Sequence, residues 1–441
     1  MDLRTRLGRA ALARPAVLLV SSPGATRVRL AVEAELARRG WPQAAGPASA
    51  DLVVFAGTPP PVRGEDWAER VWEGVPAPRA RLTVTDAEHT AHALDHGHAA
   101  LLKPVARQAG RQGHMEHAGR SAEHGHGSGH DEHDSKHDDH GGHGSGHGEH
   151  GRHSGRDEHG GHSAHGGHSG HDEPDGHGGH AGHQHHMAPV AGLPMAERAD
   201  DRDGLRLDRL HVPLGPALPD WPAGLVLRLE LQGDVVQRAE VDPVPTPAAS
   251  GPAFWNEPWL RASAGEPVTV GAAARRRCAA HLDSLGRLLG VAGWSDASAR
   301  ARDARDKALG GTVRNELVRH VRPLTRRMRR SWTLRWLMAG VGAQARGPVG
   351  EDVHGRLLAW LDAVEHSLDG LDDPAPLPDH TLRGPRGRLG TDTPPSRRLL
   401  DALPELLAGA EFACARLIVA SLDPDLDELA PRQMSGAHGH G

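Results

Sequence analysis

The chain of 441 residues carries 51 basic and 57 acidic side chains, with a formal net charge of −6. This balance does not indicate a basic surface for nucleic acid, so we expect no nucleic-acid partner. Its two cysteines, Cys278 and Cys414, form neither a CxxC pair nor a disulfide framework, and we expect a reducing cytoplasm. No apolar run approaches the ~18 residues of a membrane span, and the run at 16–20 is too short for a signal peptide.

Residues 1–105 predict a small α/β domain. Short apolar runs at 16–20, 52–57 and 81–84 are typical of buried strands. Between the first two runs, Val28, Val32 and Leu36 recur at helical spacing, and we expect this helix to end near Gly40. A strand, a helix and a strand in this order predict a parallel pair joined by a crossover.

The turn SSPGATR, residues 21–27, precedes this helix. Backbone N–H groups at such a position can bind an anion. The turn lacks the glycine spacing of the dinucleotide and P-loop motifs. We therefore interpret it as a βα turn without a ligand.

Residues 106–189 form a low-complexity tract of glycine and histidine with few apolar side chains, so we expect disorder without metal. Neutral imidazole is a ligand for nickel, zinc and copper, and glycine lets neighbouring rings meet one ion. At four ligands per ion the tract could serve about five ions. The histidines that we expect to bind metal are His124, His126, His130, His133, His137, His140, His143, His147, His150, His153, His159, His162, His165, His168, His171, His177, His180, His183, His185 and His186.

Residues 190–432 predict an α+β domain that is mainly helical, followed by a tail at 433–441. Alternating leucines between Leu225 and Leu231, a Gly233–Asp234 turn and a returning strand at 235–241 predict a β-hairpin. Apolar faces then predict helices over 278–289, 357–368 and 403–418, the last as one long helix. A basic helix beginning near Val318 is expected to be interrupted at Pro323, and 374–398 is a loop rich in proline and glycine.

Six segments between 205 and 429 resemble, in order, motifs of the hydrogenase-large-subunit-like component of NADH-quinone oxidoreductase (complex I), hereafter the large quinone-site subunit. GPALPDWPAGLVLRLELQGDVV is similar to the family's GPxHPxxHGxLRLxxxLxGExV, and RRRCAAHLDSLG to its RIxSHLxxLG helix. SWTLRWLMAGVG resembles the segment that ends in GVG, and GEDVHGRLLAWLDAVEHSL the DVYARxxxRxxE helix. RGPRGRLG resembles the EAPRGExG loop, and LPELLAGAEFACARLIVASLDPDLDEL the closing helix with its SLDP signature.

The N-terminal segment resembles the partner of that component in the same complex, hereafter the small quinone-site subunit. SADLVVFAGTPPP is similar to its ADVLLVTGxxT pattern. Together the two resemblances imply the fold of complex I subunits, with the two subunits that build the quinone site fused in one chain.

The chain departs from the family where chemistry is concerned. Leu218 and the pair Pro222–Ala223 stand where the family has quinone-site histidines, and tyrosine is absent from the sequence. The first segment has none of the four cysteines that hold the small quinone-site subunit's iron–sulfur cluster, and the nickel–iron CxxC pairs of the hydrogenases are missing. We therefore expect no iron–sulfur cluster and no surviving catalytic residues.

Three smaller features have competing interpretations. Cys278 and His281 could share a helix face as metal ligands, or be core residues, which we favour; Cys414 is expected in an inert core. Arg326, Arg327, Arg329 and Arg330, close to Trp332, Arg335 and Trp336, could bind an acidic partner, an anionic membrane surface or nucleic acid. The favoured alternative is a solvated helix face with its tryptophans in the core.

Three functions stay open. The first is a degenerate homologue of the large quinone-site subunit that assembles with complex I-like or hydrogenase-like membrane partners, cytoplasmic or peripheral at the inner face of the membrane. An oxidoreductase activity would follow from the resemblance alone. The second is an accessory or storage protein for nickel or zinc that uses the histidine tract. The third is a non-catalytic docking module that retains the fold.

Overall fold

The computed structural model describes residues 7, 10–61, 66–103, 198–200, 206–242, 251–343, 351–378 and 382–430. The chain divides into one unit formed by 1–116 and 196–441 and a second formed by 117–195. The second unit lies outside the described residues. None of the described helices is long and apolar enough to cross a lipid bilayer.

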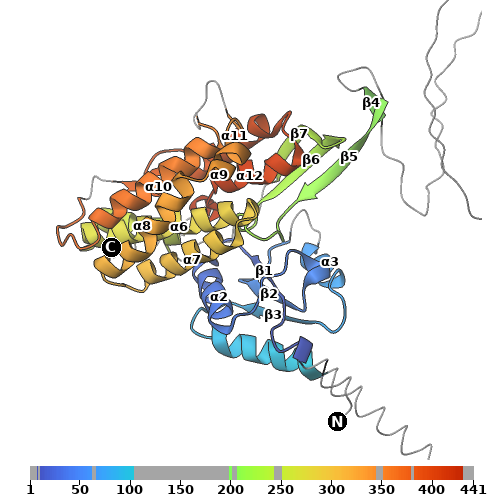
Figure 1. Cartoon of the computed structure of the whole chain (residues 1–441), viewed down its shortest axis with the longest axis horizontal. Coiled ribbons are helices and arrows are strands. Elements are labelled where there is room, and N and C mark those ends of the chain that lie inside the picture. Colours follow the sequence, from blue (N-terminus) through green and yellow to red (C-terminus); the bar gives the residue numbers. More distant parts are fainter. Residues whose placement is uncertain are drawn as a thin grey trace, which may run out of the picture. The chain divides into compact units, whose positions relative to one another are not determined.

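A three-stranded parallel sheet with the order β1-β2-β3 forms the N-terminal part (Figure 1). Its elements are β1 (Val17–Ser21), α2 (Thr26–Arg39), a 3-10 turn (Pro47–Ser49), β2 (Leu52–Ala56), α3 (Trp67–Glu73) and β3 (Ala80–Val84). Every residue of the central strand β2 is buried, because side chains of both its faces are covered. Gly40 ends α2 in the left-handed conformation with a φ of 64°. The three predicted strands and this helix are thus observed; a helical stretch at 90–103, with buried Leu94 and Leu101, was not predicted.

A four-stranded antiparallel sheet with the order β4-β5-β6-β7 begins the C-terminal part. Its strands are β4 (Arg198–Asp200), β5 (Arg206–Leu214), β6 (Val226–Gln232) and β7 (Val235–Asp242). Gln232 pairs with Val235, which confirms the predicted hairpin with its two-residue Gly233–Asp234 turn. The sheet's buried leucines pack against the helical core.

The rest of the C-terminal part is helical, with a small hairpin. Its elements are a 3-10 turn (Phe254–Asn256), α5 (Glu257–Ser263), α6 (Val270–Val291), α7 (Ser295–Leu309), α8 (Arg314–Arg329), α9 (Trp332–Met338), α10 (Val353–Asp369), β8 (Arg383–Gly384), β9 (Gly387–Arg388), α11 (Pro395–Leu407), α12 (Phe412–Leu422) and a 3-10 turn, η3 (Leu426–Leu429). Helix α6 lies at the centre: Cys278, Leu282, Leu285 and Leu288 are fully buried among neighbouring helices.

The predicted interruption at Pro323 is wrong, because α8 continues through this residue. Proline removes one backbone hydrogen bond, and its ring clashes with the preceding turn, so it is usually not tolerated at interior positions of a helix. Here Pro323 is exposed, while Val321 and Leu324 on either side of it are buried in the core. Burial of this apolar face keeps the helix continuous.

The predicted single helix over 403–418 is also wrong, because it is divided into α11 and α12 at Gly409, whose φ is 78°. The segment between α11 and α12 forms hydrogen bonds to the β6–β7 hairpin. Gly409 N–H donates to the carbonyl of Val236 at 2.8 Å, and Phe412 N–H donates to the carbonyl of Asp234 at 2.6 Å. Hydrogen bonds to a distant strand therefore replace those that a continuous helix would have made.

Candidate functional site

A buried network of charged side chains joins the N-terminal sheet to the C-terminal helices. Arg29 of α2 donates two hydrogen bonds to Asp283 of α6, from Nη1 to Oδ1 at 3.1 Å and from Nη2 to Oδ2 at 2.7 Å. Its Nη1 also donates to Glu33 Oε1 at 2.7 Å. Arg29 is 5% exposed and Asp283 1%. Two-pronged arginine–carboxylate contacts of this kind combine charge with directed hydrogen bonds.

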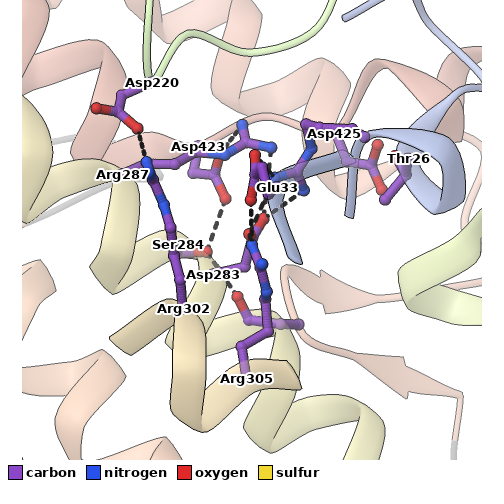
Figure 2. Close-up of polar contacts among 12 residues, drawn as sticks. Thr26, Glu33, Asp220, Asp283, Ser284, Arg287, Arg302, Arg305, Asp423 and Asp425 are labelled. Atoms are coloured by element: carbon purple, nitrogen blue, oxygen red, sulfur yellow. Dashed lines mark hydrogen bonds and ion pairs between the residues drawn. The ribbon is translucent and has the colours of Figure 1, made fainter. Parts of the chain in front are cut away.

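Arg305 of α7 closes this part of the network from a fully buried position (Figure 2). Its Nη1 donates to Glu33 Oε2 at 2.5 Å and to Asp283 Oδ1 at 2.6 Å. Burial alone would raise the pKa of Glu33, but the charges of Arg29 and Arg305 lower it to about 2. The pKa of Asp283 is likewise held well below its usual range, by Arg29, Arg287 and Arg305 against the effect of burial. Both carboxylates are therefore ionised at neutral pH.

Asp423 is the centre of the second half of the network (Figure 2). Its carboxylate accepts hydrogen bonds from Ser284 Oγ at 2.7 Å, Arg287 Nη1 at 3.0 Å and Arg386 Nη2 at 2.7 Å. Arg287 Nη2 also lies 3.4 Å from Asp283 Oδ2, so it connects the two halves. Asp423 has a φ of 41° at the end of α12, and this turn directs its side chain back toward α6.

Local sequence explains how the helices present these charges. Arg29 and Glu33 are one helical turn apart on the same side of α2 as the buried Val28 and Val32. Asp283 directly follows the buried Leu282 on α6. The prediction from sequence missed this network. Charged residues on an otherwise apolar helix face are the signal that could have revealed it, because such positions are normally buried.

The turn before α2, which we interpreted as having no ligand, donates hydrogen bonds to an anionic side chain of the protein itself. Gly24 N–H and Thr26 Oγ1 donate to the two carboxylate oxygens of Asp427, the second at 2.9 Å. Asp427 belongs to η3, near the end of the chain. The anion is thus supplied from within the protein, and the contact gives a second connection between the N-terminal part and the closing segment.

A cavity of about 210 Å³ adjoins the Asp423 half of the network. Its polar lining includes His281, Ser284, Arg356, Arg386 and Asp423. Burial, followed by the charges of Arg386 and Arg277, lowers the pKa of His281 to about 3, so this imidazole is neutral at pH 7. These residues come from four elements or turns that are distant in sequence.

Cys278 and His281 have different surroundings although both belong to α6. Cys278 lies in the core, and burial raises the pKa of its thiol to about 12. His281 lines the cavity instead. In the described ranges, no group of three or more histidine, cysteine or acidic side chains could hold a metal ion. Cys414 is only half-buried, which differs from its expected place in the core, because it lies in the first turn of α12 beside the exposed Glu411 and Ala413.

Leu218, one of the positions where the family resemblance implies a quinone-site histidine, lies beside the charge network. Leu218 lines a cavity of about 30 Å³ together with Arg29, Glu33 and Arg302. Such a volume holds one or two water molecules. Arg302 forms an ion pair with Asp220, which has the left-handed φ of 59°.

The tryptophans beside the arginine cluster are exposed, so the interpretation that placed them in the core is wrong. Trp332 is 77% exposed and Trp336 73%. They are one turn apart on the short helix α9, whose apolar contact with the core is supplied by Leu334 and Met338 instead. Arg329 of the cluster pairs with Asp362 and Glu365.

The twenty histidines from His124 to His186 that were expected to bind metal lie outside the described residues. No protein-family model matches the chain, and no curated protein matches it. A weak structural similarity links it to a chain of the membrane-bound sulfane sulfur reductase, an archaeal respiratory membrane complex. The TM-score is 0.32 and the identity 14%, over 50% of this chain and 98% of that chain.

Proposed function

We propose that this chain is a subunit or assembly partner of a membrane redox complex. Its C-terminal part would have the fold of the large quinone-site subunit of NADH-quinone oxidoreductase, and its N-terminal part would be like the small one. In this proposal the protein is peripheral, at the inner face of the membrane. Its α/β and α+β parts act together as a scaffold, with the histidine tract inserted between them.

The proposal rests on one observation: three separate segments that resemble the family's motifs contribute residues to the same cavity. His281 and Asp283 belong to the segment that resembles RIxSHLxxLG, Arg386 to the APRG-like loop and Asp423 to the SLDP-like signature. The cavity brings His281, Arg386 and Asp423 together. Chance resemblances at distant positions have no reason to converge in space, so the convergence supports a common origin for the set.

The residues at this place favour a structural role over quinone chemistry. Asp423 and Asp283 have their carboxylates engaged by buried arginines, whose charges they neutralise. Leu218 offers no proton donor where the family resemblance implies a histidine, and no tyrosine is available in the sequence. We therefore propose that the chain contributes surfaces and stability, and not the redox step.

The surface on α8 and α9 is a suitable place for a partner. Trp332 and Trp336 expose large aromatic faces, and exposed aromatic side chains next to arginine are enriched at protein interfaces. Arg326, Arg330 and Arg335 are exposed and make no ion pair with a described carboxylate. An acidic, apolar-lined surface on a partner protein would complement them.

Affinity purification from detergent-solubilised membranes of the native host tests the proposal. We expect integral-membrane subunits of a redox complex to co-purify with the wild-type chain at fixed stoichiometry, and to be lost from a Trp332→Ala, Trp336→Ala double variant. Val313→Ala is the matched control, because Val313 is also an exposed apolar residue, at 65%, and precedes α8. Recovery of the wild-type chain alone from the solubilised membranes would contradict the proposal.

A second candidate function is an accessory protein that buffers or delivers nickel or zinc. The specific observation in its favour is the density of imidazole in the tract from His124 to His186. Loss of the tract would then impair growth under metal limitation without changing the partners that co-purify. That combination separates the two functions.

A further inference from the structure

We propose that the cavity lined by His281, Arg356 and Arg386 is a binding site for a small oxyanion, a carboxylate or a phosphate group. The inference concerns the buried charges of the cavity and does not rest on the proposed function. The co-purification experiment tests the proposed function, and the anion titration below tests this site. Either can fail while the other succeeds.

Arg356 is a buried arginine without a carboxylate partner among the described residues. It is 8% exposed. Its Nε donates to Ser421 Oγ at 3.0 Å, and its Nη1 donates to the backbone carbonyls of Gly342 and Glu351. Its Nη2 is buried and has no hydrogen-bond partner within the described part of the chain. Buried charges in proteins are normally paired, so an unpaired guanidinium beside a cavity indicates an anionic ligand.

No carboxylate in the described part of the chain forms an ion pair with Arg356. Burial lowers the pKa of Arg356 to about 10, and the charges of Asp352 and Glu351 oppose this effect only in part. Residues 344–350, which precede Glu351 in the sequence, include no aspartate or glutamate. Arg356 nevertheless stays protonated at neutral pH, and its charge can be neutralised by a ligand.

Arg386 supplies a second cationic group on the cavity wall. Its side chain is 8% exposed, and its Nη1 lies 3.8 Å from Asp425 Oδ2, with no hydrogen-bond partner in the described residues. Its Nη2 and Nε are already used by Asp423, whose carboxylate also binds Arg287. Asp423 is therefore fully engaged, and the cavity keeps a positive excess from Arg356.

The remaining lining fits an oxyanion and limits its size. His281 is neutral and has a ring N–H to donate, while the hydroxyl groups of Ser284 and Ser421 already donate to Asp423 and to the carbonyl of Ile418. Trp360, Leu399 and Leu422 supply an apolar wall. About 210 Å³ accommodates a small organic acid or a phosphate. The unpaired charge of the Arg356 guanidinium attracts either group.

The larger cavity of about 920 Å³, between β7 and α11, has no buried, unpaired arginine among its described lining residues. Its acidic side chains already have partners inside the protein: Glu428 accepts from Asn256 Nδ2 at 2.7 Å and from Ser396 N–H at 2.9 Å. Asp427 binds the turn before α2. The smaller cavity is the one with an unpaired buried charge.

The experiment titrates the full-length protein with sodium formate and, separately, with inorganic phosphate, at pH 7 and constant ionic strength. Trp360 lines the cavity, so its fluorescence reports binding, and Trp360→Phe identifies its contribution. We expect saturable binding at one site. Because a hydrogen bond to a charged group contributes a factor of about ten or more, we expect Arg356→Gln to weaken affinity by at least that factor. Arg398→Gln, at an exposed arginine of α11, is the matched control and should bind as the wild type does.

Circular dichroism establishes which variants fold. If Arg356→Gln does not fold, Arg356→Lys decides, since lysine keeps the charge but not the planar pair of donors. Tighter binding of phosphate would assign a phosphoryl ligand, and tighter binding of formate a carboxylate. The proposal is overturned if neither anion binds saturably, or if a folded Arg356 variant binds with the affinity of the wild type.

Discussion

Arg29 and Asp283 are 254 residues apart in sequence, yet they form a two-pronged ion pair in which both side chains are almost completely buried. The pair connects α2, which belongs to the N-terminal α/β part, with the central helix α6. It is surrounded by Glu33 and Arg305, so both charges are shared with further partners.

The Arg29–Asp283 pair is expected to be a strong determinant of stability. Removing one partner of a buried ion pair leaves the other charge uncompensated, which typically costs about 3–5 kcal/mol. We expect Arg29→Met to lower the free energy of unfolding by this amount in urea titrations. Arg27→Met is the control, because Arg27 is on the same helix, 69% exposed and 3.8 Å from Glu257; it should change stability by less than about 1 kcal/mol. Equal effects of the two variants would contradict the network's role.

Asp425 should make the protein less stable as pH rises. Burial, followed by the charge of Asp427, raises its pKa to about 8. Between about pH 4 and pH 8 the folded state therefore holds a proton that the unfolded state has released, so stability falls with increasing pH. Asp425→Asn does not titrate. We expect its stability relative to the wild type to increase across this window by at least about 1 kcal/mol.

Thermal or urea unfolding at pH 5, 6, 7 and 8 measures this difference. Other titrating groups are shared by the two proteins, so they cancel in the comparison. Asp401→Asn, at an exposed position of α11, should follow the wild type at every pH. Parallel curves for Asp425→Asn and the wild type would show that Asp425 has an ordinary pKa.

The two cysteines should differ in reactivity. Cys278 is fully buried and burial raises the pKa of its thiol to about 12, so little reactive thiolate is present at pH 7. Cys414 is half-buried, and burial and the charge of Glu411 raise its pKa. We expect maleimide to label Cys414 slowly and Cys278 not at all in the native protein. Mass spectrometry of Cys414→Ser should detect no native label and one label in denaturant; fast native labelling would place Cys278 at the surface.

The histidine tract should determine metal content. At four ligands per ion, we expect about five equivalents of nickel or zinc on untagged protein purified without chelator or metal resin. A variant lacking Gly113 to His186 should lose them, and uptake should fall below about pH 6.5 as imidazoles become protonated. A variant with asparagine at every tract histidine keeps the length and removes the ligands. Elemental mass spectrometry measures the metal content of the wild type, the deletion variant and the asparagine variant. Metal-free wild-type protein would exclude a storage role.

The local elements could be predicted because each follows from a short-range pattern. Buried strands need short apolar runs, which identified β1, β2 and β3, and the two-residue turn at Gly233–Asp234 specified the register of β6 and β7. Helix α6 was visible because Cys278 and Leu282 recur on one side of a 3.6-residue period. These patterns depend on residues within one or two turns of each other.

The sites depend on contacts that no local pattern encodes. Sequence spacing could suggest Cys278 and His281 as a pair, but it could not show that His281 lines a cavity with Arg356 and Arg386. It also placed Trp332 and Trp336 in the core, because apolar residues at helical spacing usually face inward; Leu334 and Met338 take those inward positions. Burial of a side chain is decided by which distant helices cover it.

The sequence by itself therefore determined the strands β1, β2 and β3, the β6–β7 hairpin, the central helix α6, the histidine-rich composition and the absence of tyrosine. The tertiary structure decided the division at Gly409, the pairing of Arg29 with Asp283 and the unpaired charge of Arg356. The physical reason is the range of the interactions. Backbone hydrogen bonds and hydrophobic periodicity act over a few residues, whereas a buried charge depends on partners that only the folded chain brings within reach.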